Sequence, residues 1–75
     1  MTVENFIKEL QEEVFMETEI YLMTPEINFK DLDEWDSLTA LSLIAHFDMN
    51  LGKKISGDQI KNAVTILDLY NIAKA

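Results

Sequence analysis

The chain lacks cysteine altogether and has only two glycines, one proline and one histidine in 75 residues. Without cysteine it can form neither a disulfide nor a thiolate zinc site, so any thiol chemistry must come from an attached group. Two isolated glycines, Gly52 and Gly57, cannot make the glycine-rich loop that cradles nucleotide phosphates. A chain of this length forms one small domain, residues 1–75, with a modest core.

Long apolar runs are also absent. No run approaches the roughly 20 residues needed to cross a bilayer. Charged side chains interrupt residues 1–16, unlike the apolar centre of a signal peptide. The lack of cysteine suits a reducing compartment. We therefore expect a soluble, cytoplasmic protein without membrane insertion.

Positive charge is scarce in the first half of the chain. Residues 1–36 contain eleven acidic residues and two lysines, a net charge of −9, whereas residues 37–75 contain three acidic residues and four lysines, a net charge of +1. An acidic surface of this kind disfavours nucleic acid and anionic membranes and attracts basic partners. Acidic side chains also serve simply to keep a small domain in solution.

The spacing of apolar residues predicts two longer helices. Residues 3–16 carry an apolar stripe at helical spacing and follow Thr2, a suitable N-cap. Residues 37–51 follow Asp36, another good N-cap. Gly52 comes directly after them and can adopt the left-handed conformation that closes a helix.

Two capping boxes predict two further helices. In a capping box a serine or threonine and a side chain three residues later each bond the backbone N–H of the other. Ser56 and Gln59 make one such pair, ahead of a short helix, and Thr65 and Asp68 make the next, ahead of the last helix. No strand-like alternation persists anywhere, so we expect an all-α four-helix bundle with a short third helix.

Residues 17–36 form a long loop between the first and second predicted helices. They contain the only proline and show no sustained periodicity. About twenty residues without structure is long for a compact domain, which indicates a functional or locally folded segment. We expect the loop to pack across the helices through its apolar residues, Ile20, Leu22, Met23, Ile27, Phe29 and Leu32.

The helix predicted at residues 37–51 has more apolar surface than a small bundle needs. On a helical wheel of about 100° per residue, one apolar stripe contains Ala40, Ile44, Phe47 and Leu51. A second apolar stripe contains Leu38, Leu41, Ala45 and Met49. A narrow polar stripe, expected to face solvent, contains Thr39, Ser42, His46 and Asn50. Since one stripe suffices for the core, the second is either a partner surface or a contact with the long loop.

The sequence offers little catalytic chemistry. His46 lies about two and a half helical turns from Ser37, too far to act as its base. The aspartates that begin at Asp31 do not make a calcium loop, because the sixth position is Asp36 instead of glycine and the twelfth is Ser42 instead of glutamate. We therefore predict neither an enzyme nor a metal site.

Ser37 is the most informative residue for function. It falls on the first turn of a predicted helix, where backbone N–H groups are unpaired and the helix dipole favours negative charge. Such a position suits a phosphate ester. Taken alone, however, a serine at a helix start is usually part of a cap.

From about residue 32 to its end, the chain resembles the acyl carrier protein family, which includes acyl and peptidyl carriers. The resemblance lies in Asp36-Ser37-Leu38 at the start of a helix, in Ile55 before a short helix, and in Thr65–Leu69 at the start of the last helix. It implies a four-helix bundle of acyl-carrier type. It also implies that a separate phosphopantetheinyl transferase esterifies Ser37 with 4′-phosphopantetheine from coenzyme A.

The resemblance further implies a non-catalytic shuttle whose arm holds an acyl group as a thioester. In this family the second helix is the recognition element, contacted by acyl-loading and acyl-transfer enzymes. The residues that would make these contacts are Leu38, Leu41, Ala45 and Met49. We expect a monomer.

Two residues of the second helix also indicate the kind of pathway that the carrier would serve. Thr39 and Ser42 stand where fatty-acid carriers often have acidic residues, which favours a dedicated lipid or polyketide-type pathway. Two alternatives stay open. One is an aminoacyl or peptidyl carrier of a nonribosomal-type pathway, and the other is a helical adaptor that is never modified.

Overall fold

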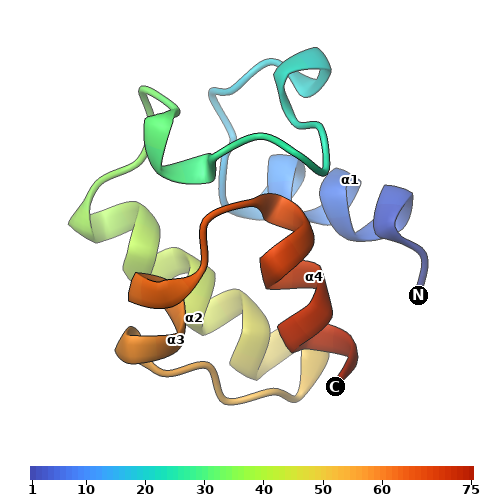
Figure 1. Cartoon of the computed structure of the whole chain (residues 1–75), viewed down its shortest axis with the longest axis vertical. Helices are drawn as coiled ribbons and strands as arrows, with labels where there is room; N and C mark the ends of the chain where they lie inside the picture. Colours follow the sequence, from blue (N-terminus) through green and yellow to red (C-terminus); the bar gives the residue numbers. More distant parts are fainter.

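All residues from 1 to 75 are described by the computed structural model, which contains four α-helices and no strand (Figure 1). The prediction of an all-α fold with a short third helix and a long connection before the second helix is confirmed. None of the helices combines the length and the apolar composition that a membrane span requires. The helices are α1 (Val3–Glu13), α2 (Ser37–Leu51), α3 (Gly57–Asn62) and α4 (Ile66–Lys74), and two 3₁₀ turns, η1 (Ile20–Leu22) and η2 (Phe29–Asp31), lie between α1 and α2.

Side-chain caps fix where the helices begin. The Thr2 hydroxyl accepts a hydrogen bond from the backbone N–H of Asn5 at the start of α1. Both predicted capping boxes form completely, one ahead of α3 and one, between Thr65 and Asp68, ahead of α4. Each cap satisfies backbone N–H groups that the first turn of a helix would otherwise leave unpaired. The helix starts were therefore readable from local sequence.

The end of α1 differs from the prediction. The helix stops at Glu13 instead of residue 16, because Val14 leaves helical geometry (φ −120°, ψ −54°). On a continuing helix the side chains of Val14 and Phe15 would point in different directions. Because the chain leaves the helix here, both side chains are buried in the core. The end of α2 is as predicted, since Gly52 closes it with a φ of 63°.

The core contains four phenylalanines from different parts of the chain, packed among aliphatic side chains. Phe6 of α1 and Phe47 of α2 meet edge to face with ring centroids 6.0 Å apart, a favoured aromatic geometry. Helix α1 also packs against α4, where Tyr70 lies 5.6 Å from the Phe6 ring. The fully buried large side chains are Phe6, Phe15, Phe29, Phe47, Leu10, Leu43, Ile66 and Leu69.

The long connection between α1 and α2 lies across the start of α4, as Figure 1 shows. The carbonyl groups of Pro25 and Ile27 accept hydrogen bonds from the first two N–H groups of α4, those of Leu67 and Ile66. The predicted packing is confirmed for Met23, Phe29 and Leu32, which are buried, and for Ile27, which is partly buried against the core.

The same prediction is wrong for two residues of η1. Ile20 and Leu22 are exposed, and so is Tyr21 between them. A single three-residue turn projects its side chains in different directions, and here only the following residue, Met23, reaches the core.

The cap of α4 gives the fold an acid-sensitive element. Two backbone N–H groups, from Val64 and Thr65, donate to the Asp68 carboxylate at 2.9 and 3.0 Å. These bonds lower the pKa of Asp68 below its ordinary 3.8, with the bond from Thr65 as the larger cause. A carboxyl group whose pKa is lower in the folded state stabilises the fold above 3.8, and this stabilisation is lost as the pH falls through the lowered pKa.

We therefore expect Asp68→Asn to weaken the fold at neutral pH and to make its stability less dependent on pH in the acid range. Urea denaturation at a series of pH values from neutral to below 3.8 measures both effects. Asp58→Asn is the matched control, because it removes a first-turn aspartate of α3 that accepts neither of these bonds. Equal acid sensitivity in the two variants would contradict the assignment to Asp68.

Candidate functional site

Ser37 is the first residue of α2 and its side chain is exposed. The N-cap is the preceding residue, Asp36, whose carboxylate accepts a hydrogen bond from the N–H of Thr39 at 2.8 Å. This bond is the main reason that the pKa of Asp36 is lowered from 3.8, so the carboxylate is ionised at neutral pH. Because Asp36 supplies the cap, the Ser37 hydroxyl takes part in no hydrogen bond of the chain and is free to carry a substituent.

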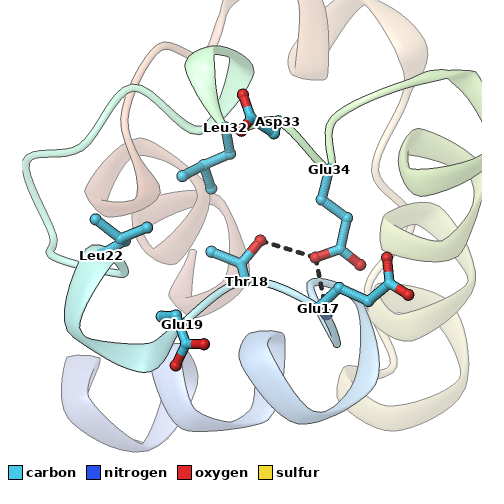
Figure 2. Close-up of a pocket in the computed structure, with 7 residues that line it drawn as sticks. All are labelled: Glu17, Thr18, Glu19, Leu22, Leu32, Asp33 and Glu34. Carbon is cyan, nitrogen blue, oxygen red and sulfur yellow. Dashed lines mark hydrogen bonds between the residues drawn. The ribbon is translucent and has the colours of Figure 1, made fainter.

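The chain entering α2 is held in place by Glu34. Its carboxylate accepts hydrogen bonds from the Thr18 hydroxyl at 2.7 Å and from the backbone N–H of Glu17 at 3.0 Å. Figure 2 shows the Glu34 side chain reaching across to these two residues. Its backbone carbonyl accepts a further bond from the Thr39 hydroxyl at 2.7 Å. Glu34, two residues before the N-cap, is therefore held through both its side chain and its backbone, which fixes the approach of the chain to Ser37.

Trp35 completes this anchor by packing between two phenylalanines. Its ring stacks on Phe15 at 6.2 Å between centroids and meets the edge of Phe29 at 4.9 Å. Both phenylalanines are fully buried, so the tryptophan ties the start of α2 to the core. Sequence reasoning missed Glu34 and Thr18 as positioning residues. The only local signal was the hydroxyl of Thr39 on the first turn of the helix.

The predicted second apolar stripe of α2 is fully on the surface. Leu38, Leu41 and Met49 have exposed fractions between 62 and 81%, and Ala45 is also exposed. The stripe begins next to Ser37 and extends about 18 Å along the helix, at 1.5 Å per residue. Asp48 is the only charged residue of α2 and pairs with Lys54 at 3.3 Å. The long loop does not cover this stripe, which leaves an apolar surface beside the serine, with Glu13 of α1 lining the same depression as Ala45 and Met49.

The predicted polar stripe of α2 is wrong for two of its four residues. Thr39 and His46 are buried, with exposed fractions of 8 and 4%, while Ser42 and Asn50 are exposed. Burial is tolerated because the Thr39 hydroxyl donates to a carbonyl and His46 Nδ1 bonds the Asn50 amide at 2.9 Å. His46 Nε2 is buried without a partner.

The core face of α2 is therefore rotated around the helix axis relative to the apolar stripe predicted for the core. It consists of Thr39, Leu43, His46 and Phe47, a regular i, i+4, i+7, i+8 pattern. Leu43, which fell in neither predicted apolar stripe, is fully buried. Of the predicted core stripe, Phe47 is fully buried, whereas Ala40, Ile44 and Leu51 are only half-buried.

The chemistry available at Ser37 is that of an exposed alcohol. His46 is nine residues away on the same helix, about 13 Å along the axis, and is turned into the core. No cluster of three or more histidine, aspartate and glutamate side chains is arranged to hold a metal ion. Ser37 lines none of the five surface depressions of the molecule. The arrangement can therefore present a group to another molecule.

The chain was also compared with known proteins. Neither a family model, a curated protein nor a solved structure matches it.

Proposed function

We propose that this protein is an acyl carrier that holds its cargo on a 4′-phosphopantetheine arm attached to Ser37. The observation that carries the proposal is the exposed, unbonded Ser37 hydroxyl at the first turn of a helix whose outward face is apolar. The Asp36-Ser37-Leu38 motif and its spacing to the segment Thr65–Leu69 support the same interpretation. A separate transferase would supply the arm from coenzyme A.

The residues around Ser37 fit such a group. A phosphodiester on the hydroxyl would lie at the positive end of the α2 dipole, where the N–H of Ser37 itself has no partner within the chain. The negative charge of Asp36 is partly offset by the N–H that it accepts from Thr39. When bound, the arm would supply the thiol that this cysteine-free chain lacks. The protein itself would only hold and present the group.

The apolar stripe of α2 would be the docking surface for the loading and transfer enzymes. Its residues are Leu38, Leu41, Ala45 and Met49. A small apolar contact suits a carrier that has to leave each partner quickly, and the flexible thioether of Met49 can adapt to several partners. We propose that the carrier acts as a monomer in a dedicated lipid or polyketide-type pathway.

The docking role predicts that Leu41→Asp slows attachment of the arm by tenfold or more while barely changing stability. Losing the burial of one leucine at a partner interface costs about 1.5–3 kcal/mol, and 1.4 kcal/mol is a factor of ten. The initial rate of arm attachment and the melting temperature are the two measurements. Asn71→Asp, an exposed site on α4, controls for the added charge. A large drop in melting temperature, or an unchanged rate, would contradict the docking role.

Intact mass spectrometry tests the proposal directly. The purified chain is incubated with coenzyme A, magnesium and a phosphopantetheinyl transferase of broad specificity. We expect the mass to increase by one 4′-phosphopantetheine group per chain. An unchanged mass would overturn the carrier function and leave the unmodified helical adaptor. The natively loaded species distinguishes an acyl from an aminoacyl cargo by its mass.

A further inference from the structure

A groove between α1 and η1 is not used by the proposed carrier function. It has a volume of about 570 Å³, the largest of the five surface depressions. Ile7 and Met23, both almost fully buried, and the half-exposed Ile20 supply its apolar surface. Glu4, Lys8 and Glu12 of α1 line it as well. The groove is therefore mainly apolar inside, with two carboxylates and one ammonium group at its edge.

The chain next to the groove exposes an unusual amount of apolar surface. Met16, Ile20, Tyr21 and Leu22 are all exposed within seven residues, Tyr21 to 73%. Of these four residues, Ile20 lines the groove itself, whereas Leu22 lines a separate depression. Exposed apolar side chains concentrated in so short a segment of a small domain indicate an interaction site. The surface is also held in place, because the side-chain amide of Gln11 donates to a carbonyl just before η1 at 3.2 Å. A partner would thus meet an ordered surface, which lowers the entropic cost of binding.

The charge around the groove selects the kind of partner. Helix α1 and residues 14–27 together contain seven glutamates and a single lysine, Lys8. None of these glutamates takes part in a salt bridge within the chain, whose one ion pair is Lys54 with Asp48. A surface with this much unpaired negative charge repels nucleic acid, anionic membranes and the same surface of a second copy.

We propose that the α1–η1 groove binds one amphipathic helix with a basic polar face, contributed by a partner protein. The apolar residues of such a helix, spaced at i, i+3 or i+4 and i+7, would insert between α1 and η1, as in other helix-in-groove complexes. Lysine and arginine on its flanks would face Glu4 and Glu12. Helix α1 has eleven residues, about 16 Å, which matches three turns of a bound helix. The inference does not depend on Ser37 or its modification.

Titration of the isotope-labelled full chain with a synthetic peptide, followed by amide chemical shifts, tests the groove. The probe is a Leu/Lys peptide of about 15 residues with leucines at helical spacing. Its control has the same composition in scrambled order. We expect the amphipathic peptide to bind more tightly than the scrambled one, with shift changes centred on Ile7, Gln11, Ile20 and Met23. Higher salt should weaken the binding, since the attraction is partly electrostatic.

Two groove variants and one control on α2 make the test specific. Ile20→Ser should weaken binding roughly tenfold by removing apolar contact. Glu12→Lys, at an exposed site, should weaken it through charge reversal even if Ile20→Ser disturbs the turn. Leu41→Ser, on the exposed stripe of α2, should leave the affinity unchanged.

Four results would overturn the proposal. They are an absence of binding, equal binding of the scrambled peptide, shift changes centred on α2, and a concentration-dependent dimer that buries the groove in the free protein. All of these measurements use the unmodified chain. Failure here therefore leaves the mass test of Ser37 unaffected, and failure of the mass test leaves the groove unaffected.

Discussion

Ser37→Ala should abolish attachment of the phosphopantetheine arm completely and leave the fold intact. The reaction needs the hydroxyl oxygen as the atom that forms the phosphodiester bond, and alanine has no atom to replace it. The fold should survive because Asp36, and not Ser37, caps α2. Alanine is also a better helix former than serine, so the helix loses nothing at this position. Intact mass and far-ultraviolet circular dichroism of the same sample measure the two effects.

Ser42→Ala is the matched control for this variant. Ser42 is also an exposed serine of α2, about one and a half turns from Ser37. Its replacement should leave the mass gain unchanged. Ser56 is unsuitable as a control, because its hydroxyl caps α3. A mass gain that survives in the Ser37→Ala variant would place the modification elsewhere, and loss of helical signal would make Ser37 a structural residue.

The parts of the fold that were predictable depend on neighbours in the sequence. The caps at Thr2, Asp36 and Thr65 each bond a backbone N–H three residues away. Such bonds are set by local geometry, so the residue types alone reveal them. The exposed stripe beside Ser37 was visible for the same reason, because helical spacing places Leu38, Leu41, Ala45 and Met49 on one face.

The burial of Thr39 and His46 was not predictable, because both are polar residues whose bonding partners inside the fold are not indicated by a polar-outside pattern. The Thr39 hydroxyl can be buried because it donates a hydrogen bond to the carbonyl of Glu34, which lies just before the start of α2. His46 enters the core with one ring nitrogen bonded to Asn50 and the other unpaired, a state that a polar-outside pattern does not indicate. With both residues inside, the core face moves around the helix to Leu43.

The role of Glu34 in holding the start of α2 was not predictable from the sequence either. Glu34 finds its partners Thr18 and Glu17 across sixteen and seventeen residues of irregular chain. In the sequence it is one of eleven acidic residues in the first half, most of which are exposed. Nothing in residue type separates it from these solvated neighbours. Only the path of the connection between α1 and α2 brings the three residues together.

The largest effect on stability should come from Leu43→Ala, with Leu41→Ala as its matched control. Both variants remove the same atoms from the same helix, and alanine and leucine are both strong helix formers. Leu43 is fully buried, so its truncation leaves a cavity and should lower the free energy of unfolding by about 2–5 kcal/mol. Leu41 is largely exposed, and its truncation should change that energy by less than about 0.5 kcal/mol.

The size of the expected loss makes the experiment decisive for a domain of this length. At about 0.05–0.15 kcal/mol per residue, 75 residues give a total stability of roughly 4–11 kcal/mol. Leu43→Ala should therefore remove a large share of it and shift the urea midpoint by about 0.7 molar or more, given a slope of about 1–3 kcal/mol per molar. The fluorescence of Trp35, which lies between two core phenylalanines, reports the transition. If Leu41→Ala lowered the free energy of unfolding as much as Leu43→Ala, the face of α2 assigned to partners would instead be part of the core, and the docking surface proposed beside Ser37 would not exist.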